Sequence, residues 1–192
     1  GCGKSVTAAS VLRLVPRPPG RILSGEVRFA GRDLLRLPTE ELSEVRGQEI
    51  AMIFQDPMTS LNPVFQVGAQ VGEAIHIHQR LKGDTLLDKV INVLRQVKIS
   101  AAESRIKDYP HQLSGGMRQR VVGAISISCQ PRVLIADEPT TSLDATVQAQ
   151  YLKLLKDIQA ESDLSIIFIT HDLGIVAKMC DKVAVMYAGR IV

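Results

Sequence analysis

The stretch VLIADEP at residues 133–139 decides the fold class, because it is a short apolar run that ends in two acids. Such a run is typical of a buried strand in a mostly parallel sheet. Three further runs share the pattern, at residues 50–54, 166–169 and 183–186. Between them, apolar residues recur at helical spacing, as at Leu87, Val90, Ile91 and Leu94, and at Tyr151, Leu154, Leu155 and Ile158. Alternating strands and helices predict an α/β domain.

Two stretches interrupt this alternation. Residues 26–29 alternate polar and apolar side chains and run into AGRD at residues 30–33, which predicts a small antiparallel β annex. Residues 62–129 show successive helical patterns and no convincing strand, so we expect an inserted helical subdomain there. The chain as a whole, residues 1–192, is expected to form a single domain.

Composition excludes several classes of protein. The chain has 192 residues, 45% of them hydrophobic, which is enough for a full core. Its formal net charge is +3 and its arginines are spread singly, so no nucleic-acid partner is expected. The three cysteines (Cys2, Cys129 and Cys180) lie far apart, which suggests neither a disulfide framework nor a zinc site and fits a reducing cytoplasm. No apolar run approaches the roughly 18 residues of a spanning helix, so any membrane role is expected to need a partner.

The first five residues match the last five positions of the P-loop pattern G-x-x-x-x-G-K-[ST]. They are Gly1, Cys2, Gly3, Lys4 and Ser5. In such a loop, backbone N–H groups and the start of the next helix, here near Val6, surround phosphate oxygens. The lysine reaches the outer phosphates of ATP and the serine hydroxyl binds Mg²⁺. The alternative is a glycine turn that caps a surface helix.

The two acids at the end of the 133–139 run suggest the second half of a nucleotide site. Parallel strands of open α/β folds present their ligand sites at the carboxyl edge of the sheet. We therefore predict that Asp137 binds Mg²⁺ or its water shell, and that Glu138 orients and deprotonates the attacking water. The alternative is two acids at a solvated strand end.

The octapeptide LSGGMRQR at residues 113–120 resembles the signature of the ABC ATPases. Ser114 offers a hydroxyl, while Gly115 and Gly116 allow backbone N–H groups to approach a phosphate at the start of a helix. The resemblance implies that these three residues bind ATP, and that the fold is a P-loop NTPase (RecA-like) core. A plain serine-capped helix is the structural alternative for this motif alone.

Three further residues fit the same resemblance. Gln55 follows the run at residues 50–54 and corresponds to the family glutamine that contacts Mg²⁺ and the water. Ser142-Leu143-Asp144 matches the loop by which one subunit reaches the other's nucleotide, so Asp144 is a candidate ATP contact. His171 matches the histidine that contacts the γ-phosphate. In isolation each residue is more often structural.

Within the family, the chain looks like the dipeptide and oligopeptide importer ATPases, a group that includes nickel importers. Three segments show this likeness: FQDPMTSLNP at residues 54–63, YPHQLSGGMRQR at 109–120 and MYAGRIV at 186–192. The leading P-loop glycine and the adenine-stacking aromatic residue of the family lie upstream of Gly1, and a C-terminal extension usual in this group is also missing. We therefore expect a fragment that binds ATP weakly by itself.

The resemblance implies ATP hydrolysis that powers import of a solute, with a peptide as the implied class. Its implied partners are a second ABC ATPase subunit, identical or homologous, in a head-to-tail dimer, two membrane permease subunits, and indirectly a solute-binding protein. The implied location is peripheral, on the cytoplasmic face of the inner membrane. Two alternatives stay open. One is a chromosome-maintenance or DNA-repair ATPase, but such a protein needs a long coiled-coil insertion, and Gln55 and Leu113 are only 58 positions apart. The other is a nucleotide-binding switch without hydrolysis.

Overall fold

A computed structural model describes residues 2–56, 59–141 and 143–192. Three parallel strands form its central sheet in the order β3-β4-β5, with β3 at Ile50–Ile53, β4 at Val133–Asp137 and β5 at Ser165–Ile169. Three of the four predicted core strands are therefore confirmed. β4 lies in the middle and is almost wholly buried, as its unbroken apolar run requires.

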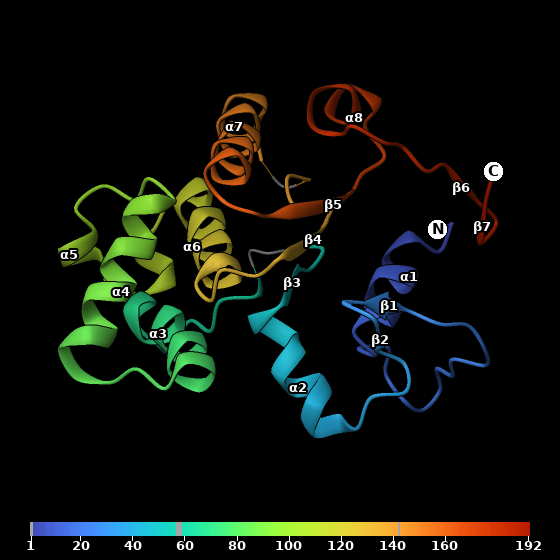
Figure 1. The fold of residues 1–192 in the computed structure, drawn as a ribbon. Coiled ribbons are helices and arrows are strands. Elements are labelled where there is room, and N and C mark those ends of the chain that lie inside the picture. The colour runs from blue at the N-terminus through green and yellow to red at the C-terminus, as the bar shows by residue number, and fades with distance from the viewer. Residues whose placement is uncertain (1, 57–58, 142) are drawn as a thin grey trace.

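The chain between β3 and β4 forms helices in the part that the structure describes (Figure 1). They are α3 (Val67–Gln79), α4 (Gly83–Gln96), α5 (Ala102–Arg105), the 3₁₀ turn η2 (Pro110–Gln112) and α6 (Gly115–Ile127). α4 confirms the predicted helix, but its buried face differs in part: Val90 and Leu94 are buried as expected, Val93 joins them, and Leu87 is 43% exposed. α6 packs against both α3 and β3, so it connects the helical block to the sheet.

A second apolar cluster lies on the other side of the sheet. It joins α1 (Lys4–Val11), α2 (Thr39–Gln48) and β4 through Leu12, Leu42, Val45 and Ile135. The guanidinium N–H groups of Arg46 in α2 donate hydrogen bonds to the Leu12 and Arg13 carbonyls at the end of α1. The shortest, from Nη2 to the Leu12 carbonyl, is 2.6 Å. Burial and the neighbouring Arg13 lower the pKa of Arg46. The carbonyl bonds fix the position of α1 beside the sheet.

The predicted β annex is confirmed as a hairpin of β1 (Arg28–Phe29) and β2 (Arg32–Asp33). Its two strands are antiparallel and pair Arg28 with Asp33. The Asp33 carboxylate accepts N–H groups from Val27 and Leu35, and these bonds, chiefly the one from Val27, lower the pKa of Asp33. These bonds tie together the residues that flank the two strands of the hairpin.

The prediction of a fourth buried strand at residues 183–186 is wrong. After α7 (Ala145–Glu161), β5 and α8 (Leu173–Met179), the chain ends in a small antiparallel pair, β6 (Met186–Tyr187) and β7 (Arg190–Ile191). Val183 and Val185 are 59% and 56% exposed. The physical reason is that a strand needs a hydrogen-bonding neighbour, and β5 pairs with β4 alone among the described strands.

None of the helices in the described residues is long and apolar enough to cross a membrane.

Candidate functional site

The carboxyl ends of the three parallel strands bring three candidate residues to one edge of the sheet. Ile53 pairs with Ala136, and Ala136 pairs with Phe168. Gln55 comes two positions after Ile53, Glu138 comes two positions after Ala136, and His171 comes three positions after Phe168. The register therefore carries all three side chains to the edge where ligand sites of parallel sheets form.

Glu138 is held at this edge by two side chains. Its Oε1 lies 3.2 Å from Nδ1 of His171, and its Oε2 accepts the hydroxyl of Thr141 at 3.1 Å. The Glu138 side chain is 16% exposed, whereas that of His171 is 69% exposed. The carboxylate is thus oriented from two sides while one partner remains open to solvent.

The backbone of Glu138 adopts an unusual conformation. Its φ is 47°, in the left-handed region that costs a non-glycine residue on the order of 1 kcal/mol or more. The conformation persists because the Glu138 N–H donates to the Ile169 carbonyl at 2.9 Å and the Glu138 carbonyl accepts the Thr141 N–H at 3.3 Å. The turn is therefore anchored to the end of β5.

Asp137, the last residue of β4, is 3% exposed and its Oδ1 has no hydrogen-bond partner among the described residues. An orphaned, buried carboxylate oxygen costs free energy unless a ligand satisfies it. The described residues contain no cluster of three or more His, Cys, Asp or Glu side chains that could hold a metal ion. A single buried carboxylate such as that of Asp137 fits Mg²⁺, which commonly uses one or two carboxylates together with phosphate and water oxygens.

The backbone at Gly3, just before α1, has a left-handed conformation. Gly3 has φ 96° and precedes the first residue of α1, Lys4, while its carbonyl accepts the Thr7 N–H at 2.9 Å. The left-handed φ favours glycine at this position. Lys4 and Ser5 are half-buried, and Val6 is 61% exposed. Gly1, also assigned to this site, lies outside the described residues.

The loop at Cys2 and Gly3 rests on the terminal hairpin. The Cys2 carbonyl accepts the Gly189 N–H at 3.0 Å, and a Cβ added at Gly3 would lie 3.7 Å from the Met186 sulfur. Residues near the two ends of the described chain therefore meet beside the candidate site, as the positions of N, β6 and β7 in Figure 1 show.

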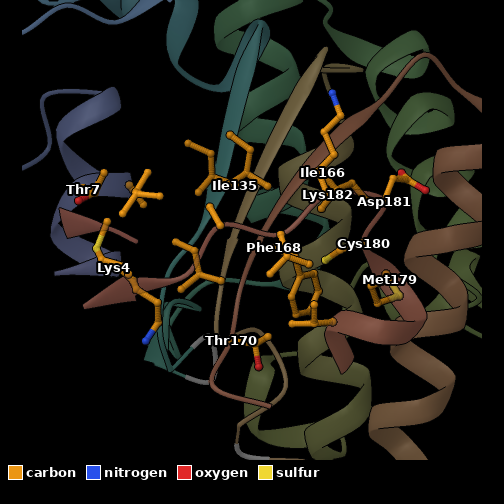
Figure 2. Close-up of a pocket in the computed structure, with 18 of the residues that line it drawn as sticks. Lys4, Thr7, Ile135, Ile166, Phe168, Thr170, Met179, Cys180, Asp181 and Lys182 are labelled. Atoms are coloured by element: carbon orange, nitrogen blue, oxygen red, sulfur yellow. The ribbon is translucent and has the colours of Figure 1, made fainter. Parts of the chain in front are cut away.

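A cavity of about 610 Å³ separates α1 from β5 (Figure 2). Its walls are mainly apolar and come from α1, from residues 166–170 and from residues 179–186. Figure 2 shows the Lys4 ammonium and the Thr170 hydroxyl toward the same end of the cavity. Because apolar walls do not suit a polyphosphate, the polar end near Lys4 and Thr170 is the part that fits phosphate.

Ser114, Gly115 and Gly116 lie at the start of α6. Ser114 is exposed and its side chain caps the helix by accepting the Met117 N–H at 3.3 Å. A Cβ added at Gly116 would lie 2.8 Å from Cγ1 of Val147, so this glycine also allows α6 to approach α7. No hydrogen bond joins these three residues to Asp137, Glu138 or His171 within the described part of the chain.

Asp144 caps α7, which is the structural alternative for this residue. Its Oδ1 accepts the N–H groups of Thr146 and Val147, both at 3.0 Å. Its Oδ2 makes no hydrogen bond to the residues that the structure describes. Ser142, quoted for the same motif, lies outside the described residues.

Two neighbours of the site were absent from the sequence predictions. Thr141 binds the Glu138 carboxylate, and Gln119 of α6 donates to the Pro139 carbonyl at 2.6 Å. Gln119 is fully buried and shares a helix face with Val122 and Gly123, also buried. A polar residue within an apolar stripe of a helix was the available signal for Gln119. Gln55 is exposed and makes no hydrogen bond among the described residues.

Comparison with known proteins shows the family of the chain. The family model described as ABC transporter matches residues 1–141. The probable peptide ABC transporter ATP-binding protein y4tR of Sinorhizobium fredii is 55% identical over the whole chain, which covers 57% of that protein. The oligopeptide transport ATP-binding protein OppD of Bacillus subtilis is 53% identical, again over the whole chain, which covers 54% of it. The chain thus spans about half the length of these curated relatives.

A solved structure shares the fold. The solved structure of cbiO1 from Clostridium perfringens, part of the ABC transporter complex cbiONQ, is 30% identical and superposes with a TM-score of 0.80. The chain is covered completely and the match spans 71% of cbiO1, which confirms the P-loop fold class predicted from the sequence. Since the family model also matches most of the residues, this chain belongs to the ABC transporter family.

Proposed function

We propose that the chain binds and hydrolyses ATP as the nucleotide-binding subunit of a transporter that imports peptides. The observation that supports this most strongly is Glu138, fixed at the carboxyl edge of the sheet by His171 and Thr141 and directly following the buried, unpartnered Asp137. The names of the two curated relatives, both of which specify peptide or oligopeptide transport, support the solute class.

The phosphates of ATP would lie at the start of α1. The N–H groups of residues 2–6 and the helix dipole favour negative charge there, and Lys4 adds a full positive charge. Ser5, Gln55 and Asp137 would hold Mg²⁺, which neutralises phosphate charge when bound. Asp137 is the residue whose environment supports this most clearly, because its buried Oδ1 needs a partner.

Glu138 would act as the general base. Its carboxylate already accepts from Thr141 and lies against His171, so its orientation is set before any substrate binds. A positioned carboxylate can orient a water and take its proton as the oxygen attacks the γ-phosphorus. The exposed His171 ring can contact the γ-phosphate on the same side. Phosphoryl transfer depends on such positioning and charge stabilisation.

The signature residues would serve the nucleotide of a second ATPase subunit, identical or homologous, in a head-to-tail dimer. Ser114 is exposed at the start of α6, and Gly115 next to it has no Cβ to block an approaching phosphate. The exposed Asp144 has one carboxylate oxygen with no partner among the described residues. These features support a surface that is completed by another subunit.

Contact with two membrane permeases would use the segment between β3 and α3. Phe54, Val64 and Phe65 are 47%, 71% and 55% exposed. The end of this segment is ordered by Gln70, whose side chain donates to the Asn62 and Phe65 carbonyls at 3.0 and 2.9 Å. Exposed apolar side chains next to a stretch that Gln70 holds in place suit protein docking. The subunit would then lie on the cytoplasmic face of the inner membrane, and a solute-binding protein would act indirectly.

The proposal is tested by uptake of labelled di- to pentapeptides into proteoliposomes that hold the assembled transporter with ATP inside. We expect uptake to require ATP and to fall at least about tenfold in Lys4→Ala, because the charge that holds the outer phosphates is gone. Lys153→Ala, which changes an exposed lysine of α7, serves as the control. ATP-independent uptake, or equal uptake by both variants, would contradict the proposal.

A further inference from the structure

Gln119 makes a buried contact that the proposed roles leave unexplained. Its side chain is 0% exposed, and its Nε2 donates to the Pro139 carbonyl at 2.6 Å. Pro139 directly follows Glu138. The bond therefore joins α6, which begins with the signature glycines, to the turn that carries the proposed general base.

An amide at this position is costly compared with an apolar side chain. Gln119 Oε1 and the Tyr151 hydroxyl are both buried, and neither makes a hydrogen bond of normal length to the described residues. Burial raises the pKa of Tyr151 to about 12, and the nearby Gln119 side chain, which is too far away for a regular hydrogen bond, opposes this only in part. A core made only for stability would use an apolar residue here, because a half-satisfied buried amide costs free energy.

The turn that Gln119 contacts is under strain. Glu138 has φ 47°, and its N–H is tied to Ile169 of β5 at 2.9 Å. Gln148 of α7 donates to the Thr140 hydroxyl at 3.2 Å. The Gln119 bond adds an anchor from α6, so the turn is held from the sheet and from two helices.

We infer that Gln119 is a positioning residue, which fixes the turn at residues 138–141 and couples the start of α6 to the Glu138 carboxylate. This inference rests on the proposed function. Ser114 caps the helix that carries Gln119. A displacement of the signature by nucleotide in the neighbouring site therefore moves the Gln119 amide that donates to the Pro139 carbonyl. The orientation of Glu138 then depends on whether the other site is occupied.

The test replaces Gln119 in the whole protein, assembled in its transporter. Gln119→Met and Gln119→Leu keep the volume of the side chain and remove the donor. We expect kcat for ATP hydrolysis to fall about 10- to 100-fold with KM for ATP changed less than about twofold, since misplacing a catalytic group by an ångström has effects of this size. Gln119→Glu, whose protonated carboxyl still donates to the carbonyl, should keep at least a third of the turnover.

Ser126→Ala is the matched control. Ser126 is a buried polar residue of the same helix, but its hydroxyl donates to Val122 within α6 and has no link to the turn. This variant should keep its kcat within about twofold. If Ser126→Ala and Gln119→Met lose kcat equally, or if Gln119→Glu is no better than Gln119→Met, the positioning role is refuted.

A double-variant comparison separates this inference from the proposed function. In a Glu138→Gln background, Gln119→Met should leave the residual turnover unchanged, because Gln119 acts through Glu138. A further fall of tenfold or more there would overturn the inference alone. Full turnover by Glu138→Gln itself would overturn the proposed function.

Discussion

Asp144→Ala is expected to destabilise the protein by about 1 kcal/mol, because it removes the cap of a helix that supplies much of the core. Asp144 accepts two N–H groups in the first turn of α7. Helix α7 buries Tyr151, Leu154, Leu155 and Ile158. Losing an N-cap side chain typically costs ~1 kcal/mol. In a domain of this size, that cost lowers the Tm by roughly 2–4 °C.

Asp144→Asn separates capping from charge. Asparagine caps about as well as aspartate, so the Tm should change by less than half as much as in Asp144→Ala. If the carboxylate also reaches a neighbouring subunit, the asparagine variant should lose ATP turnover while keeping its stability. Asp144→Ala should lose both.

The assay is thermal unfolding of the whole protein followed by circular dichroism, with steady-state ATP hydrolysis measured on the same samples. Glu161→Ala is the control, because Glu161 is an exposed acid at the opposite end of α7, where a carboxylate caps nothing. Equal Tm values for Asp144→Ala and Glu161→Ala would refute the capping argument.

Two further predictions concern packing and titration. Gly116→Ala places a Cβ 2.8 Å from Cγ1 of Val147, so we expect it to lower the free energy of unfolding in urea by ~1–3 kcal/mol. Val147→Ala in the same chain should largely relieve this loss. If the losses of the two single variants simply add in the double variant, the prediction is contradicted. The raised pKa of Tyr151, about 12 against an unperturbed 10, favours the neutral phenol in the folded state. The stability that this contributes is complete below pH 10 and is lost as pH rises toward 12. The difference between wild type and Tyr151→Phe in urea unfolding should therefore shift over that window, and a constant difference from pH 9 to 12 would contradict the assignment.

The sequence predicted the fold where local pattern determines structure. Continuous apolar runs marked β3, β4 and β5, and the buried face of α7 followed from its 3.6-residue spacing. The run at residues 183–186 has the same composition but no paired neighbour in the described structure, and composition does not reveal pairing. A strand is therefore less predictable than a helix, whose hydrogen bonds are local.

The site was predictable only in part. The end of the run at residues 133–139 indicated Glu138, whereas Gln55 and His171 came from the family resemblance. The structure brings Glu138 and His171 together although they are 33 residues apart. The contacts of Thr141 and Gln119 could not be foreseen, because they depend on the left-handed turn at Glu138 and on how α6 packs against it. The cap at Asp144 shows that a family motif residue can also have a local structural role.

The central claim, that Glu138 is the general base of an ATPase, is tested most directly by the steady-state ATP hydrolysis rate of Glu138→Gln in the assembled transporter. Glutamine keeps the size of the side chain and can still lie beside His171 and Thr141, but it cannot take a proton. We predict a fall in kcat of at least about 100-fold with ATP affinity retained, in line with typical contributions of a positioned acid or base. An unchanged kcat would contradict the claim.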